Sequence, residues 1–306
     1  MNMLANTKQI LIKAHQGKYA VGHFNINNME IVQGIVQAAE KLRSPVILAT
    51  SEGAIEYAGI NFLYELAKTA SELSSVPVAL HLDHGKDLKI IKQCIDLGYS
   101  SVMIDASHED FEKNVRLTKQ VVQWAHKKRI SVEAELGTIG GKEDKVHSRG
   151  IIYTNPAKAA EFVRRTGCDF LAVAIGTSHG AYKFSGTAKL QIEILKKIKS
   201  QTNIPLVLHG ASGVPAEIVK LAEKYGAKLS GVQGVPEAQV KLAIKNGINK
   251  INTDTDLRIA FDAGVRQAVK EHPEDFDPRH ILAPARELIQ KVVEQRIKLF
   301  GSAGKA

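Results

Sequence analysis

Residues 77–85 read Pro-Val-Ala-Leu-His-Leu-Asp-His-Gly, an apolar run that ends in two ionisable side chains and a glycine. A continuous apolar run of this length is typical of a strand buried on both faces, as in a parallel sheet. Seven further runs of the same kind recur along the chain. The eight predicted strands are Tyr19–Asn25, Pro45–Thr50, Pro77–Asp83, Ser101–Asp105, Ser131–Leu136, Asp169–Ile175, Pro205–His209 and Gly247–Asn252.

Segments between these runs carry apolar residues at spacings of three and four, which predicts amphipathic helices. Ile31–Ala39, Val115–Ala125 and Ile218–Ala222 are examples. Eight strand–helix units without a break in composition predict an α/β fold, a single (β/α)8 barrel of the TIM type over residues 1–306.

Three additions to the barrel are expected. An N-terminal helix, about Thr7–Gln16 within residues 1–18, would cap the barrel bottom. The glycine-rich, charged segment 137–155 follows the fifth strand, and a loop of that length is predicted to be a mobile active-site loop. A C-terminal tail, 273–306, carries a further amphipathic helix, about Pro284–Phe300. Packing of that tail on its own barrel and on a partner subunit are both open.

The composition is that of a folded protein with anionic ligands. Hydrophobic residues make up 44% and charged residues 24% of the 306, which argues against disorder. The net charge of +9 would suit nucleic acid, a membrane surface or anionic metabolites. The chain has no zinc-finger spacing and no long basic tract, so phosphorylated small molecules are the simplest explanation and no nucleic-acid partner is expected.

Compartment can also be predicted from the sequence. Cys94 and Cys168 lie far apart in apolar settings, which indicates buried reduced thiols and a cytoplasmic location. The segment Met1–Lys8 lacks the apolar core of a signal peptide, and no apolar run approaches the roughly 18 residues of a membrane span. We therefore expect neither a signal peptide nor a membrane partner.

Polar side chains mark the carboxyl ends of the predicted strands, where barrels of this type hold their active sites. Unpaired polar groups are expensive to bury, so packing alone does not explain this pattern. The residues concerned are Asn25, Asn27, Ser51, Asp83, His84, Asp105, Glu133, Glu135, His179, His209, Asn252 and Asp254.

Three of these strand-end residues predict a metal site. His84, His179 and His209 come from different strand ends, and each lies beside a glycine. Three imidazoles with an open fourth position make a catalytic zinc site. Asp105 and Glu135 could line a second metal position, orient the histidines, or pair with the barrel's own lysines and arginines.

His81 points the same way as Asp83 along the predicted strand, because side chains alternate with a period of two. We expect His81 to support a metal ligand or to lie in the core rather than to ligate.

Two glycine- and hydroxyl-rich turns predict phosphate sites. Gly210-Ala211-Ser212-Gly213 leads into a helix that starts near Pro215, and free N–H groups at a helix start bind phosphate. Asn252–Thr255 repeats the arrangement after the eighth strand. Gly180 and Lys183 could complete the first cradle, and Arg258 could hold a second phosphate through both branches of its guanidinium.

Taken together, these motifs resemble the class II fructose-bisphosphate aldolases over nearly the whole chain. The segments that carry the resemblance are Gly22–Asn28, Val78–Gly85, Val132–Glu143, Gly176–Lys183, Leu208–Gly213 and Asn252–Arg258.

The resemblance implies a role for each matching residue. His84, His179 and His209 would bind the catalytic zinc, and Asp105 and Glu135 would line a second divalent position. Asp83 would be the acid/base at the C4 oxygen, and Glu143 would exchange the proton on the ketose-phosphate carbon. A monovalent cation, Na⁺ or K⁺, is also implied. The substrate-binding residues would be Asn25, Ser51, Gly180, Lys183, Gly210, Ala211, Ser212, Asn252, Thr253, Asp254, Thr255 and Arg258.

The implied reaction is reversible cleavage of fructose 1,6-bisphosphate to dihydroxyacetone phosphate and glyceraldehyde 3-phosphate, in glycolysis and gluconeogenesis. Breaking the C3–C4 bond leaves an enediolate, whose charge zinc would stabilise. A Schiff-base lysine is unnecessary, because Lys183 lies in a loop and Lys250 precedes the end of its strand.

The alternatives are a tagatose 1,6-bisphosphate aldolase and a catalytically silent barrel that binds sugar phosphates. Asp254-Thr255 favours the fructose enzyme, since the tagatose relatives tend to carry Ala-Thr there. The family also implies a homodimer or a homotetramer.

Overall fold

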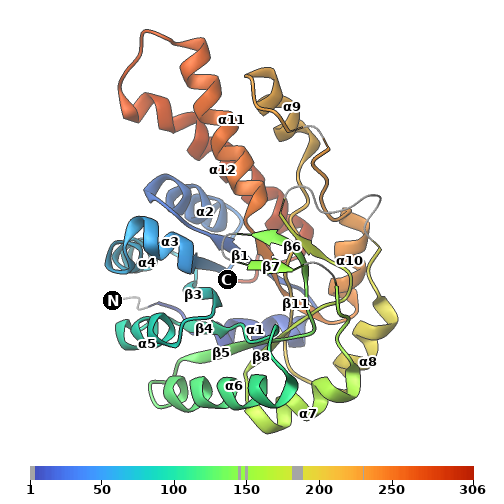
Figure 1. Cartoon of the computed structure of the whole chain (residues 1–306). Coiled ribbons are helices and arrows are strands. Elements are labelled where there is room, and N and C mark those ends of the chain that lie inside the picture. Colours follow the sequence, from blue (N-terminus) through green and yellow to red (C-terminus); the bar gives the residue numbers. More distant parts are fainter. Residues whose placement is uncertain (1–3, 144–145, 149–150, 181–188, 230) are drawn as a thin grey trace.

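A closed barrel of parallel strands forms the centre of the computed structural model (Figure 1). The model describes residues 4–143, 146–148, 151–180, 189–229 and 231–306, with only the backbone of 140, 142–143, 146–148 and 179. The strands run around the barrel in the order β1-β11-β10-β8-β5-β4-β3-β2. Their bounds are β1 (Val21–Asn25), β2 (Val46–Ser51), β3 (Val78–Gly85), β4 (Ser101–Ile104), β5 (Ser131–Leu136), β8 (Phe170–Val173), β10 (Leu206–Leu208) and β11 (Ile248–Thr253). The predicted (β/α)8 barrel is confirmed.

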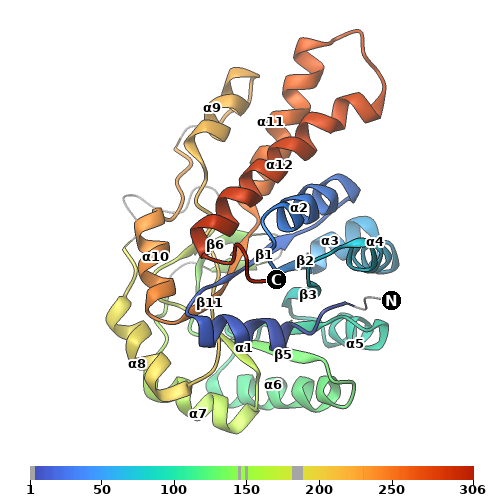
Figure 2. The same cartoon turned by 180° about the vertical axis from the view of Figure 1, so that it is seen from behind.

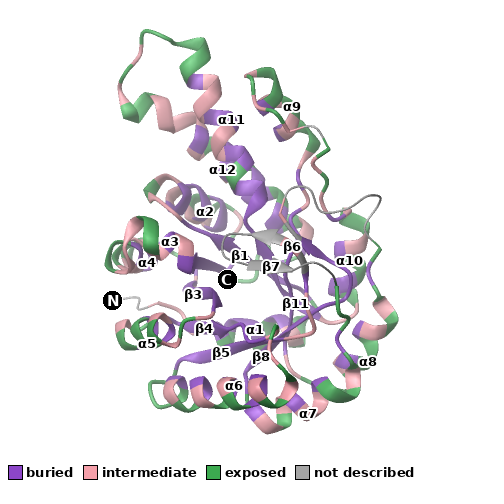
Figure 3. Cartoon of the chain, viewed as in Figure 1, coloured by how far each residue is buried: buried purple, intermediate pink, exposed green. Residues whose placement is uncertain are grey.

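Helices cover the outside of the barrel and turn their buried faces inward (Figure 3). In α2, for example, Asn28 accepts a hydrogen bond from Ile31 N at 3.0 Å, and Ile31 and Ile35 are buried. No described helix combines the length and the apolarity that a membrane crossing requires. The helices are α1 (Thr7–Gly17), α2 (Met29–Lys41), α3 (Glu52–Ala58), α4 (Ile60–Leu73), α5 (Leu88–Leu97), α6 (Phe111–His126), α7 (Pro156–Thr166), α8 (Ile192–Thr202), α9 (Ala216–Lys224), α10 (Glu237–Lys245), α11 (Thr255–Glu271) and α12 (Pro278–Phe300).

The N-terminal helix α1 closes the bottom of the barrel, as the sequence predicts (Figure 2). Ile10, Leu11 and Ala14 form one apolar cluster with side chains from the amino-terminal parts of the strands. Those strand residues are Val21, Ile47, Ala79, Phe170 and Val207. The barrel is therefore a filled core, and its polar groups gather at the opposite end.

Part of the segment 137–155 forms strands. It contains an antiparallel hairpin of β6 (Gly140–Glu143) and β7 (Val146–Ser148), and β6 also pairs with β9 (Ser178–His179). These strands have only two to four residues and are mostly polar or glycine, so they leave no alternating apolar pattern in the sequence. Residues 144–145 and 149–150 lie outside the described residues.

The C-terminal helix begins earlier than predicted, at Pro278 instead of Pro284. Asp277 caps it by accepting from Arg279 N at 2.9 Å, and Pro284 lies inside the helix. Buried residues such as Val292 and Ile297 belong to the main core of the same chain. Of the two open alternatives, packing on its own barrel is the one that the structure shows.

Candidate active site

Buried polar side chains converge at the carboxyl end of the barrel. Asp83 and His84 lie just before the end of β3, Asp105 follows β4, and His209 follows β10. All four are less than a tenth exposed. The strands are parallel, so their carboxyl ends meet on one side of the barrel, and residues far apart in sequence become neighbours.

Two histidines form the centre of this group. His84 Nε2 and His209 Nδ1 lie 2.8 Å apart, with the two rings nearly perpendicular. The outer nitrogen of His84 bonds Asp105 Oδ2 at 3.0 Å, and that of His209 bonds Glu133 Oε1 at 2.7 Å. A carboxylate on the outer nitrogen fixes the tautomer, so both inner nitrogens present lone pairs to each other.

Two lone pairs that face each other require a cation between them, either a proton or a metal. Burial lowers the pKa of His84, but the carboxylates of Asp83 and Asp105 outweigh burial and raise it to about 10. Burial and the neighbouring His84 lower the pKa of His209 to about 4. Two imidazoles oriented by buried carboxylates are the donor set that zinc prefers, so these residues fit a metal ion.

The backbone at His84 supports the same interpretation. Its φ of 48° lies in the left-handed region, which residues other than glycine rarely adopt. The pairing of β3 with β4 shifts register at this point, between Leu82 and Gly85. At this irregularity the His84 ring faces His209, and strained residues of this kind gather at functional sites.

Asp83 lies beside the histidine pair and is held by amides. Asn25 Nδ2 donates to its Oδ2 and Asn252 Nδ2 to its Oδ1, both at 3.0 Å. Burial raises the pKa of Asp83, but the rings of His23 and His84 outweigh burial and lower it well below the usual value. The side chain is therefore held as a carboxylate, and one ligand atom each from Asp83, His84 and His209 lie within 4.8 Å of one another.

Asp105 and Glu135 form a second group with His84, whose possible ligand atoms also lie within 4.8 Å of one another. Ser107 Oγ donates to Asp105 Oδ1 at 2.7 Å. Burial and the adjacent Asp105 raise the pKa of Glu135 well above its usual value. Among the described residues, Glu135 Oε2 has no hydrogen-bond partner. Two carboxylates crowded in this way suit a position for a divalent cation.

A layer below Asp83 includes residues that the sequence reading did not select. Lys250 is fully buried, and its Nζ lies 2.8 Å from Asn252 Oδ1 and 2.9 Å from Glu133 Oε2. One ammonium group thus links the carboxylate behind His209 to the amide that holds Asp83. Glu133 was among the predicted strand-end residues, and the available signal for Lys250 was the period of two that places it on the same face of its strand as Asn252.

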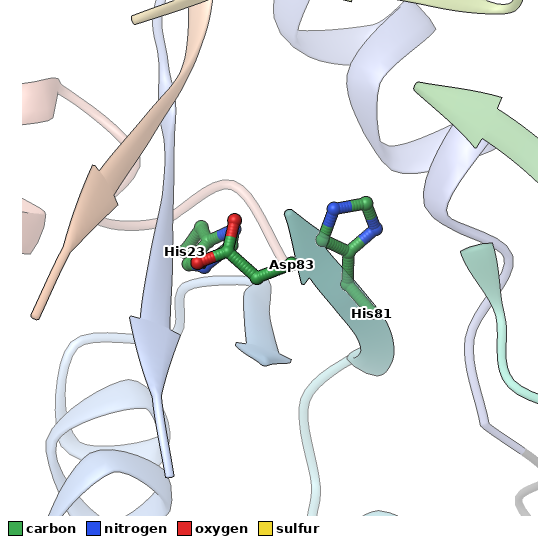
Figure 4. A group of neighbouring side chains, drawn as sticks. All are labelled: His23, His81 and Asp83. Atoms are coloured by element: carbon green, nitrogen blue, oxygen red, sulfur yellow. The ribbon is translucent and has the colours of Figure 1, made fainter. Parts of the chain in front are cut away.

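His23 and His81 complete this layer. His23 Nε2 lies 3.6 Å from Asp83 Oδ2, and the ring centroids of His23 and His81 are 5.4 Å apart (Figure 4). His81 Nδ1 bonds Ser101 Oγ at 2.7 Å, and the ring is fully buried. His81 therefore lies in the core, one of the two places expected for it. His23 was not selected at all, although it precedes Asn25 by two residues on β1.

The predicted phosphate turns lie beside this site. Gly210 has a φ of 60°, and a Cβ there would lie 2.6 Å from Ser178 O, so the turn requires glycine. Ser212 Oγ accepts from Asp254 N at 3.4 Å, which joins the two turns. Helix α9 starts at Ala216, as predicted, and the remaining turn residues are buried: Ala211, Asn252, Thr253 and Thr255.

Other predicted residues have partners within the protein or are not described. Arg258 holds Asp254 through two contacts, Nε to Oδ1 at 2.9 Å and a second nitrogen to Oδ2 at 2.7 Å. Ser51 Oγ caps α3 by accepting from Ala54 N at 3.1 Å. The backbone of His179 pairs with Gly141, but its side chain and that of Glu143 are not described, and Lys183 lies outside the described residues.

The fold and the site define a (β/α)8-barrel enzyme with a candidate metal centre, and comparison with known proteins narrows that class. The model of the family "Fructose-bisphosphate aldolase class-II" matches residues 5–305. A fructose-bisphosphate aldolase from Giardia intestinalis is 49% identical, over 99% of this chain and 94% of its own. One from Thermus caldophilus is also 49% identical, over 99% of this chain and its own full length.

Solved structures agree. The YdjI aldolase from Escherichia coli K12 superimposes with a TM-score of 0.80 at 36% identity, covering 99% of this chain and 100% of its own. A fructose-bisphosphate aldolase from Campylobacter jejuni gives 0.76 at 26% identity, covering 97% of this chain and 95% of its own. This chain belongs to the class-II fructose-bisphosphate aldolase family, whose members are lyases, and the resemblance read from its motifs is confirmed.

Proposed function

We propose that this protein catalyses the reversible aldol cleavage of fructose 1,6-bisphosphate to dihydroxyacetone phosphate and glyceraldehyde 3-phosphate. Membership of the family supports the reaction and the substrate class. The observation that carries the proposal is the grouping of Asp83 with the paired rings of His84 and His209. A base beside a cation site is what cleavage of a carbon–carbon bond next to a carbonyl needs.

In the proposed mechanism Asp83 is the acid/base. Its carboxylate accepts the proton of the C4 hydroxyl during cleavage and returns it during synthesis. Asn25 and Asn252 hold both carboxylate oxygens, which orients the group before the substrate arrives. Glu143 is proposed to exchange the proton on the ketose-phosphate carbon.

We assign the zinc ion to His84 and His209, with His179 as third ligand, and a second divalent position to Asp105 and Glu135. When bound, zinc supplies a Lewis acid for the substrate carbonyl. The orientation of both described rings by buried carboxylates supports the assignment.

For the phosphate groups we propose the two turns Gly210–Gly213 and Asn252–Thr255. N–H groups at the starts of α9 and α11 would face one phosphate. Gly180 and Lys183 are proposed to complete that cradle, with a monovalent cation nearby, and Ser51 and Arg258 to hold the second phosphate.

We make three further proposals, on the loop after β5, the oligomeric state and the cellular compartment. Segment 137–155 would act as a lid, and the chain would work as one domain in a homodimer or homotetramer. The buried, unpaired thiols of Cys94 and Cys168 support a reducing cytoplasm.

The test is a side-by-side assay of fructose 1,6-bisphosphate and tagatose 1,6-bisphosphate cleavage, as purified, after EDTA, and with zinc restored. The two sugars differ only at C4, the carbon next to Asp83. We expect preference for the fructose compound and activity that follows the metal. EDTA-resistant cleavage would contradict the metal site, and preference for tagatose bisphosphate would contradict the substrate assignment.

The matched variant is Asp83→Asn, which keeps the shape of the side chain and removes the base. We expect cleavage to fall by about 10²–10⁴-fold while zinc content stays unchanged, because general base catalysis contributes that much. Unchanged activity in this variant would remove Asp83 from the mechanism.

A further inference from the structure

A buried ion pair lies behind the phosphate turn Gly210–Gly213 and joins it to the two C-terminal helices. Arg296 of α12 donates from Nε to Asp256 Oδ2 at 2.8 Å, and the side chains are 6% and 0% exposed. Asp256 belongs to the first turn of α11, directly after Asn252–Thr255. The pair therefore connects α12 to both proposed phosphate turns.

The same carboxylate also holds the backbone that follows the turn. Asp256 Oδ1 accepts from Val214 N at 2.8 Å, and its Oδ2 accepts from Gly213 N at 3.3 Å. Val214 has a φ of 48°, a left-handed conformation that is strained for a β-branched residue. Such a conformation persists only where the surroundings enforce it, and here Asp256 supplies the enforcing contact.

Close packing also restricts the backbone at Gly213. A Cβ on Gly213 would lie 2.6 Å from a terminal nitrogen of Arg296, so the guanidinium lies directly against the turn. A Cβ on Gly234 would lie 2.1 Å from the carbonyl carbon of Gly213, so a second loop presses on the turn as well. Arg296 thus orients the Asp256 carboxylate and also supports Gly213 by contact.

The direction of the turn decides where Ser212 lies. Its carbonyl accepts from Val235 N at 3.1 Å and its Oγ accepts from Asp254 N at 3.4 Å. If Val214 relaxed to a negative φ, the chain would leave Val214 in another direction, so the turn Gly210–Gly213 and the start of α9 would have to shift relative to each other.

We infer that Asp256 and Arg296 are positioning residues, which hold Val214 in its left-handed conformation and thereby keep the turn Gly210–Gly213 shaped for the substrate phosphate. This inference rests on the proposed function in one respect, that a phosphate binds this turn. The competing explanation is that the pair only fastens α11 to α12 and contributes to stability.

The decisive variant is Arg296→Met, which keeps much of the side-chain volume and removes the partner of Asp256. Calorimetric titration with inorganic phosphate and with dihydroxyacetone phosphate, on the zinc-loaded protein, gives the affinity of the turn. We expect both ligands to bind about tenfold more weakly or worse, since strain of the size found at left-handed residues corresponds to such factors. KM for fructose 1,6-bisphosphate should rise by a similar factor with zinc content unchanged.

Val214→Gly in the Arg296→Met background separates the two explanations. Glycine adopts positive φ without strain, so the double variant should recover most of the phosphate affinity although the ion pair is still missing. By itself, Val214→Gly should leave phosphate affinity within about twofold, because the native φ stays accessible. A purely structural role of Arg296 would predict no recovery.

Glu294→Gln on the same helix is the control. Glu294 lies two residues before Arg296, and its Oε1 is 2.9 Å from Lys41 Nζ of α2, so this variant weakens the packing of α12 and leaves the ion pair between Arg296 and Asp256 in place. It should lower Tm and leave phosphate affinity unchanged.

The inference is overturned if Arg296→Met lowers Tm alone, or if Val214→Gly restores nothing. Should Arg296→Met fail to fold, Asp256→Asn with and without Val214→Gly gives the same comparison. A protein that binds phosphate as predicted but cleaves no fructose bisphosphate would sink the proposed function and leave this inference standing.

Discussion

The orientation of His84 and of His209, two of the three proposed zinc ligands, depends on a buried carboxylate. Asp105 accepts from His84 and Glu133 from His209, and each contact leaves the other ring nitrogen facing the centre. Although burial raises the pKa of Glu133, Lys250 together with the rings of His209 and His81 outweighs burial and lowers it, so Glu133 stays ionised. Lys250 thus balances a charge that would otherwise be costly inside the barrel.

Glu133→Gln tests this arrangement. The amide oxygen can still accept from His209, but the ring loses an anionic partner and becomes a weaker ligand. We expect zinc affinity to fall by about 10–100-fold, the usual effect of removing such a partner. Competition with a chromophoric chelator measures it, and Glu112→Gln, at an exposed ion pair with Arg165, is the control. Equal zinc affinity in both variants would show that Glu133 does not support the ligand.

Helices α11 and α12 pack so closely that one glycine decides their contact. A Cβ on Gly264 would lie 2.4 Å from the Cα and N of Ala285, and both are backbone atoms. Pro284 precedes this contact inside α12, where its missing N–H removes one helical hydrogen bond. The predicted helix start at Pro284 was wrong because Asp277 caps the helix earlier.

Gly264→Ala should therefore destabilise the protein, even though alanine favours a helix by about 1 kcal/mol over glycine. Overpacking typically costs about 1–3 kcal/mol, and here the neighbouring backbone cannot move aside easily. Thermal unfolding followed by circular dichroism measures the change in Tm. Lys270→Ala, at an exposed position of the same helix, should stay within about 0.5 kcal/mol of the parent. A Tm raised by Gly264→Ala would contradict the packing argument.

At the scale of the whole molecule, stability and chemistry occupy opposite ends of the barrel. The bottom is filled by apolar residues of α1 and of the strand starts, and the polar site lies at the strand ends. One chain of hydrogen bonds links the two ends: the His81 ring contacts the hydroxyl of Ser101, which donates to the hydroxyl of Thr7 in α1. Because the apolar cluster at the bottom contains none of the polar site residues, changes there should alter stability much more than activity.

Leu11→Ala examines that separation, because Leu11 is fully buried in the bottom cluster. We expect a loss of about 2–5 kcal/mol in the free energy of unfolding, from lost burial and the cavity left behind. Denaturant titration measures it. Steady-state kinetics well below the lowered Tm should give unchanged kcat/KM, and a large fall in kcat/KM with little loss of stability would refute the separation.

The sequence by itself determined the barrel and most of its candidate site. Strand runs and helix periods are local patterns, and parallel strands bring their ends together, so Asp83, His84 and His209 could be placed beside one another from their positions alone. The turn at Gly210 could be predicted in the same way, because its glycines and the helix start after Pro215 are adjacent in the chain.

The tertiary structure alone decided which buried charges pair. Glu133 on β5 meets Lys250 on β11, although two strands separate them around the barrel. Arg296 reaches Asp256 only because α12 folds back along α11. Such pairs depend on which side chains cross the barrel interior and how deep each reaches, and no local period in the sequence encodes that depth. Local sequence patterns predict which side chains lie at the strand ends. Which buried charges pair beneath those side chains is decided by how the barrel closes.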